Sequence, residues 1–185
     1  MGIPSMSDLA AYEPRWPGVV ELKISDQWRA RFVDEQDLPP NAPVAYAYAI
    51  LYMGDKGYVC REAGADRWGT LEGALDGKER AEAFVKRIAK ERVGAVIGKL
   101  ALVGFLECKA TSHNPDYEAG AVTVRPIYVA VAKKVGEVAE GSGYDRRRLP
   151  LNEHFKALRA RYPELDDYFG KAAQQYAVMR AKGEA

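Results

Sequence analysis

A run of helix-forming residues near the middle of the chain restricts the fold more than any other feature. Residues 78–93, KERAEAFVKRIAKERV, contain neither glycine nor proline, and Gly94 follows where a helix would end. Two strand-like segments around a turn at 54–55 precede this run, and apolar segments at 99–110 and 121–135 follow it. The order predicts an α/β (α+β) fold in which a helix packs against a sheet.

The two ends of the chain differ from this central part. Prolines interrupt residues 1–43, and the short pieces VVELKI and WRARFV between them predict an N-terminal β-ribbon. We interpret the chain as one domain with three parts: the extension 1–43 packed on the core, the core 44–150, and C-terminal helices in 151–185.

Three local features shape the expected C-terminal part. The segment DRRRL at 145–149 is typical of a solvated linker face. Asn152 is a candidate N-cap for the first terminal helix, and Pro163 should separate that helix from the last one.

Composition narrows the classes of function. The net charge of +1 and the pI of about 7.7 argue against a nucleic-acid partner and against an anionic membrane surface. The longest apolar stretch, at 43–53, is about half the length that a membrane-spanning helix needs. No targeting signal is visible, and two cysteines in apolar runs, Cys60 and Cys108, indicate reduced core thiols, so we expect a cytoplasmic protein.

The spacing of five residues gives the helical run a family likeness. Gly73 is followed after five residues by Glu79 and after seven more by Arg87, and Glu91 and Gly94 come next in the expected places. Residues 73–95 therefore resemble a degenerate box of the Nudix hydrolase superfamily, the MutT-like proteins, whose pattern is GX5EX7REUXEEXGU with U aliphatic. The resemblance implies an α/β/α sandwich with a mixed β-sheet.

The resemblance also implies a pyrophosphohydrolase that uses Mg²⁺ or Mn²⁺. In the family, three glutamates at i, i+3 and i+4 of the box helix hold the cations that bridge the substrate's pyrophosphate. The same positions here are Ile88, Glu91 and Arg92, so two of the three carboxylates are missing. Any divalent ion should bind weakly, because Glu91 stands alone and Arg92 repels a cation.

The remaining box residues take their roles from the resemblance. Glu91, Glu79 and Arg87 occupy the positions of catalytic residues, although an internal salt bridge explains Glu79 and Arg87 better. Glu72 replaces the glycine that usually precedes the box and supplies a backbone carbonyl for the metal, so Glu72 and Glu91 are the candidate metal ligands. Five acids elsewhere are alternatives that we expect to be solvated surface charges: Asp76, Glu82, Glu107, Asp116 and Glu118.

A ligand site follows from the same comparison. Arg61 matches a position where many Nudix proteins place an arginine on the substrate phosphates, and Arg92 can join it, because guanidinium groups pair well with phosphate oxygens. Gly73, at the start of the box, completes the candidate ligand-binding set.

The sequence leaves two functions open. The first is a module that binds a nucleotide-like or pyrophosphate-containing ligand and has weak or lost metal-dependent hydrolysis. The second is a divergent but active Mg-dependent pyrophosphohydrolase that acts on a nucleoside diphosphate linked to another group. Whether the chain is an enzyme depends on which of these is right. The family likeness also suggests a homodimer.

Overall fold

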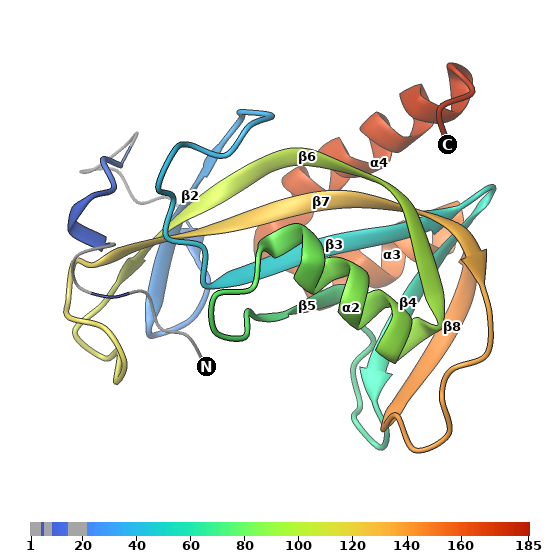
Figure 1. Cartoon of the computed structure of the whole chain (residues 1–185), viewed down its shortest axis with the longest axis horizontal. Coiled ribbons are helices and arrows are strands. Elements are labelled where there is room, and N and C mark those ends of the chain that lie inside the picture. Colours follow the sequence, from blue (N-terminus) through green and yellow to red (C-terminus); the bar gives the residue numbers. More distant parts are fainter. Residues whose placement is uncertain (1–4, 6–8, 15–21) are drawn as a thin grey trace.

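The computed structural model of the chain describes residues 5, 9–14 and 22–185 (Figure 1). The helices and strands in these ranges are, in chain order, β1 (Leu22–Lys23), β2 (Trp28–Val33), β3 (Tyr46–Met53), β4 (Lys56–Glu62), β5 (Leu71–Ala74), α2 (Ala81–Val93), β6 (Ala95–Ala110), β7 (Val122–Val135), β8 (Tyr144–Pro150), α3 (Leu151–Arg161), the 3₁₀ helix η1 (Pro163–Leu165) and α4 (Asp166–Ala181).

The strands form one mixed sheet in the order β1-β2-β6-β7-β3-β4-β8. Strands β3 and β7 run parallel, and the other neighbouring pairs are antiparallel. One edge of β3 is shared, because Tyr46–Ala49 pair with β5 whereas Leu51–Met53 pair with β4. Strand β4 then leaves β3 and pairs along its length with β8. The sheet therefore divides between β4 and β5, and one bridge, between Cys60 of β4 and Gly69 just before β5, spans the division.

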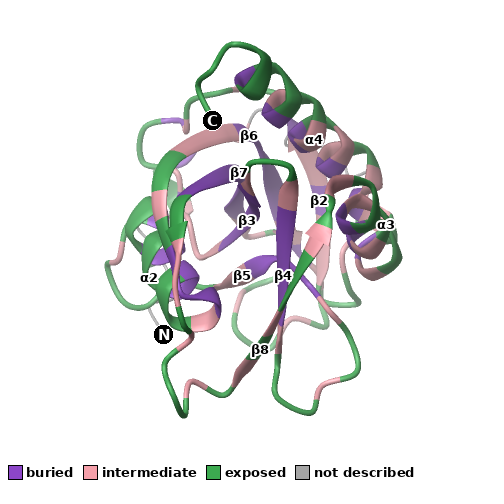
Figure 2. Ribbon diagram, turned by 90° about the vertical axis from the view of Figure 1, so that its right-hand side faces the viewer, coloured by how far each residue is buried: buried purple, intermediate pink, exposed green. Residues whose placement is uncertain are grey.

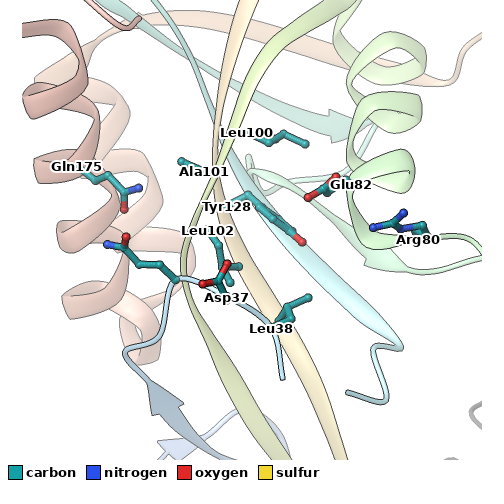
Figure 3. A pocket seen from close by; sticks show the side chains of 10 residues that line it. Asp37, Leu38, Arg80, Glu82, Leu100, Ala101, Leu102, Tyr128 and Gln175 are labelled. Carbon is teal, nitrogen blue, oxygen red and sulfur yellow. The ribbon is translucent and has the colours of Figure 1, made fainter. Parts of the chain in front are cut away.

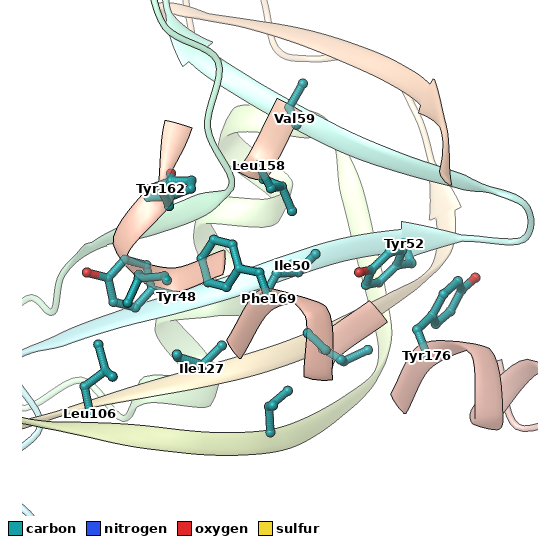
Figure 4. Close-up of a cluster of buried hydrophobic side chains, with 14 of the residues drawn as sticks. Tyr48, Ile50, Tyr52, Val59, Leu106, Ile127, Leu158, Tyr162, Phe169 and Tyr176 are labelled. Carbon is teal, nitrogen blue, oxygen red and sulfur yellow. The ribbon is translucent and has the colours of Figure 1, made fainter. Parts of the chain in front are cut away.

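Alternating residues of β3 explain how helices come to cover both faces of the sheet. Tyr48, Ile50 and Tyr52 lie in a buried cluster with side chains of α3 and α4 (Figure 4). Ala47, Ala49 and Leu51 point to the opposite face, where α2 packs. Figure 2 shows buried residues concentrated in the central strands, among them β3 and β7, and exposed residues on the outer sides of the helices. The α/β/α sandwich with a mixed sheet is thereby confirmed.

Several local expectations agree with the structure. The hairpin turns at Gly54 and Asp55, and α2 ends at Gly94, whose φ of 74° is left-handed. Cys60 and Cys108 are both free and buried. The N-terminal ribbon appears as the antiparallel pair of β1 and β2, while residues 15–21 of that segment lie outside the described residues. No helix in the described part of the chain has the length and apolar composition needed to cross a membrane.

Two expectations for the C-terminal part are wrong. Asn152 does not cap a helix, because β8 continues to Pro150 and α3 begins directly at Leu151. The DRRRL segment is not a linker. It forms most of β8, which pairs antiparallel with the outer edge of β4. Its Arg146 donates to the carbonyl of Gly136 at 2.5 Å and to that of Val93, so it satisfies the C-terminal end of α2.

His154 fixes α3 against the hairpin. Its side chain is buried, and its Nε2 lies 3.3 Å from the carbonyl oxygen of Tyr58, to which it donates as the neutral tautomer. A Cβ added at Gly57 would lie 2.2 Å from the imidazole ring, so a glycine in β4 is required for this approach. Burial lowers the pKa of His154 to about 4 from an ordinary value of 6.5.

The stability of the fold should therefore fall in mild acid. The unfolded chain binds a proton on His154 below pH 6.5 while the folded chain resists it until about pH 4. The neutral His154 contributes its full share to the free energy of unfolding above pH 6.5. This share, on the order of 3 kcal/mol, is lost as the pH falls from 6.5 to about 4. Urea unfolding at several pH values should show a shallower decline for His154→Gln than for the wild type. Equal declines would contradict a buried neutral imidazole.

Candidate functional site

The box loop connects β5 to α2 and sets their distance. Gly73 lies in β5 opposite Ala47, and a Cβ there would lie 3.2 Å from Phe84 and 3.5 Å from the guanidinium of Arg92. The glycine therefore allows α2 to approach the strand closely. This approach brings the last turn of the helix beside the divided edge of the sheet.

Ile88 belongs to the core. Its side chain is 1% exposed and packs in the cluster that joins α2 to the sheet, together with Phe84 and Val85. The interpretation of Ile88 as part of an apolar stripe is confirmed. A carboxylate at this position would have to be buried among apolar side chains.

Arg92 reaches back from α2 to β5. Its Nη1 donates a hydrogen bond to the backbone carbonyl oxygen of Glu72 at 2.6 Å, and its guanidinium lies 4.8 Å from the ring centre of Tyr144 on β8. This carbonyl is the one that the family resemblance offers to a metal ion. In this chain a guanidinium occupies the position beside it.

Glu79, Arg87 and Glu91 form a separate network on the exposed side of α2. Arg87 donates through Nε and Nη2 to the two carboxylate oxygens of Glu79, both at 2.9 Å, and through Nη1 to Glu91 at 3.2 Å. The Arg87 side chain is 40% exposed and that of Glu91 is 55% exposed. The hydrogen bonds from Arg87 also hold the pKa of Glu79 below its usual value. The expected Glu79–Arg87 bridge is present, and Glu91 pairs with the same arginine.

A pocket of about 350 Å³ opens where the sheet divides. It extends from α2, which contributes Arg92, to α3, which contributes Arg161, and Tyr144 of β8 lines it as well. Its charged lining residues are four arginines and two glutamates, namely Arg61, Arg67, Arg92, Arg161, Glu62 and Glu72, which gives a formal excess of two positive charges. The pocket therefore favours an anionic ligand.

The structure brings together only part of the predicted site. Arg61, Glu72, Gly73 and Arg92 line this pocket, whereas Glu79, Arg87 and Glu91 are not among its lining residues. Sequence reasoning missed Arg161, Arg67 and Tyr144. These residues come from α3, the β4–β5 connection and β8, and only the fold shows that they meet.

Arg61 is held in place on two sides. Its Nε lies 3.2 Å from Oδ2 of Asp145 on β8, and its guanidinium lies 4.4 Å from the ring centre of Trp68. The guanidinium of Arg147 lies 4.3 Å from the ring of the same tryptophan. Cation–π contacts of this kind are attractive, so the Trp68 ring holds both guanidinium groups beside it.

Glu72 brings a carboxyl group into the arginine-lined pocket. Its side chain is 21% exposed, and one of its oxygens lies 4.0 Å from Nη2 of Arg161. Burial raises the pKa of this carboxyl, and a hydrogen bond with Tyr162 and the charge of Arg161 partly offset the effect. Tyr162 also accepts a hydrogen bond from the backbone N–H of Thr70 at 3.1 Å.

The five alternative acids lie elsewhere. Glu107 is buried and accepts a hydrogen bond from the Tyr12 hydroxyl at 3.1 Å, so its expected position on the surface is wrong. Glu82 lies near Tyr128 in a different pocket between α2 and α4 (Figure 3). None of Asp76, Glu82, Glu107, Asp116 and Glu118 lines the arginine-rich pocket. Within the described ranges, no group of three or more His, Cys, Asp or Glu side chains could hold a metal ion.

Comparison with solved structures identifies the fold. The Bacillus subtilis pyrophosphohydrolase BsRppH, crystallised as a mutant, aligns with a TM-score of 0.54 at 19% identity, over 66% of this chain and 72% of that one. A MutT NUDIX hydrolase from Burkholderia pseudomallei aligns more loosely, with a TM-score of 0.43 at 20% identity, over 58% and 82%. The C. elegans Ap4A hydrolase aligns with a TM-score of 0.45 at 16% identity, over 72% of this chain and 98% of that one.

The fold of this chain is thus the Nudix fold, as the box resemblance predicted. No family model and no curated protein sequence matches the chain. The resemblance therefore rests on the box residues and on the three-dimensional arrangement around them.

The exposed network on α2 should contribute little to stability. We expect Arg87→Ala to lower the free energy of unfolding by about 1 kcal/mol, because solvent screens the Arg87 side chain, which is 40% exposed, even though that of Glu79 is 17% exposed. Urea unfolding of Arg87→Ala, Glu79→Ala and the double variant gives the coupling between the two side chains. Lys86→Ala, an exposed neighbour on the same helix, is the control. A loss above about 3 kcal/mol would indicate a buried pair instead.

Proposed function

We propose that this Nudix-fold protein binds a nucleotide-like or pyrophosphate-containing ligand and has weak or lost metal-dependent hydrolysis. The observation that carries the proposal is the hydrogen bond of 2.6 Å from the Arg92 guanidinium to the Glu72 carbonyl. By the box resemblance, this carbonyl would contact the divalent cation of a Nudix hydrolase, and here a fixed positive charge contacts it instead.

The donor set does not fit Mg²⁺ or Mn²⁺. Both ions take oxygen ligands, usually with one or more carboxylates. At the three box positions Ile88 is apolar and buried, Glu91 is bound to Arg87 on the exposed side, and Arg92 is itself a cation. An ion at this place would have to displace the guanidinium of Arg92 and overcome its repulsion. Metal-dependent hydrolysis is therefore not part of the function that we propose for this site.

The arginines of the pocket supply what an anionic ligand needs. Guanidinium groups donate paired hydrogen bonds to phosphate oxygens and keep their charge at all relevant pH values. Arg61, Arg92 and Arg161 reach the pocket from three different elements, so they can contact a diphosphate from several sides. A volume of about 350 Å³ lies in the range of small-molecule sites.

Binding should therefore be independent of metal. We expect calorimetry to detect binding of inorganic pyrophosphate and of ADP in the presence of EDTA, with an affinity that excess Mg²⁺ does not increase. Arg92→Ala should weaken both by at least about tenfold, because a charge-assisted hydrogen-bond donor is lost. Arg87→Ala removes an arginine from the same helix but outside the pocket, and should leave both affinities unchanged.

The competing function gives opposite results. If the chain is an active Mg-dependent pyrophosphohydrolase, Glu91 must leave Arg87 and act with Glu72 on a cation. Ligand binding would then require Mg²⁺, and a nucleoside diphosphate compound would be cleaved on the order of once per second or faster. Either result would overturn the proposal, as would a failure of pyrophosphate and ADP to bind.

A further inference from the structure

A pocket that binds only phosphate does not explain the carboxyl group of Glu72 in its lining. It lies on β5 opposite Tyr48, and therefore on the face of the sheet that α3 covers. Four arginines line the same pocket. A carboxylate there repels a phosphate group and lowers the net positive charge, so a ligand that is only an anion would bind better without it.

Glu72 is not explained by a need to neutralise Arg92. That arginine is satisfied by the backbone carbonyl of Glu72 rather than by its side chain. The ion pair of the carboxyl with Arg161 is loose, at 4.0 Å, and Tyr162 provides one hydrogen bond. A carboxyl group can accept about four hydrogen bonds, so Glu72 retains capacity to accept from a ligand.

Neutral hydrogen-bond donors on a ligand suit the Glu72 carboxyl group in this pocket better than cationic donors do. An ammonium group would approach Glu72 against the formal excess of two positive charges in the pocket lining. Hydroxyl groups donate hydrogen bonds without that repulsion. A diphosphate joined to a sugar presents an anionic end and several hydroxyl donors in one molecule.

Building on the proposed function, we propose that Glu72 is a specificity-determining residue that accepts hydrogen bonds from the sugar hydroxyls of a diphosphate ester. Arg61 and Arg92 hold the diphosphate, and Glu72 selects the group attached to it. The pocket thereby discriminates against inorganic pyrophosphate and against esters whose attached group lacks hydroxyls.

Three probes test this assignment: inorganic pyrophosphate, ADP and 2′,3′-dideoxy-ADP, each titrated by calorimetry in EDTA. The wild type should bind ADP at least about tenfold more tightly than dideoxy-ADP, because a hydrogen bond to a charged group contributes that much. In Glu72→Ala the two affinities should become equal, and pyrophosphate should bind more tightly than to the wild type. Glu153→Ala removes an exposed carboxylate from α3, outside the pocket lining, and should retain the preference for ADP.

The outcomes separate the inference from the proposed function. Equal binding of ADP and dideoxy-ADP to the wild type overturns the role of Glu72 while leaving a phosphate site intact. A preference for ADP that persists in Glu72→Ala, or that disappears equally in Glu153→Ala, also overturns the role of Glu72. If no probe binds the wild type, the proposed function fails and this inference fails with it. Should Glu72→Ala not fold, Glu72→Gln, which keeps the size and one acceptor oxygen, should show a reduced preference for ADP.

Discussion

The hydrogen bond between the Arg92 guanidinium and the Glu72 carbonyl connects the elements that surround the pocket. It joins the last turn of α2 to β5, and the same guanidinium lies over Tyr144 of β8. Gly73 permits this contact, because a side chain at that position would meet Phe84 and Arg92. The contact also places a permanent positive charge at the divided edge of the sheet, and our functional proposal follows from that charge.

The box residues are split between two tasks. Glu79 and Glu91 both pair with Arg87 on the exposed side of α2, and Ile88 packs into the core. Gly73 and Arg92 line the pocket together with Glu72. Most of the box thus supports the helix, while its two ends shape the site. We propose that ligand binding can persist in such an arrangement because guanidinium charge does not depend on a bound ion.

The fold was predictable from local patterns, whereas most of the pocket lining was not. The uninterrupted run at 78–93, which contains α2, and the strand-like segments on either side of it already predicted a helix packed against a sheet. The pairing of Arg146 with the end of α2 is a tertiary contact that the DRRRL segment does not reveal. Arg161 lies almost ninety residues after Glu72, and only the packing of α3 brings them together.

The central claim is that Arg92 takes the place of a divalent cation, and a titration with Mn²⁺ tests it most directly. Electron paramagnetic resonance detects the free ion, so bound Mn²⁺ appears as a loss of signal. We expect the wild type to leave the signal of micromolar Mn²⁺ almost unchanged, because the Glu72 carbonyl oxygen already accepts a hydrogen bond from the Arg92 guanidinium. Tight binding of two or more ions per chain, without any ligand present, would contradict the claim.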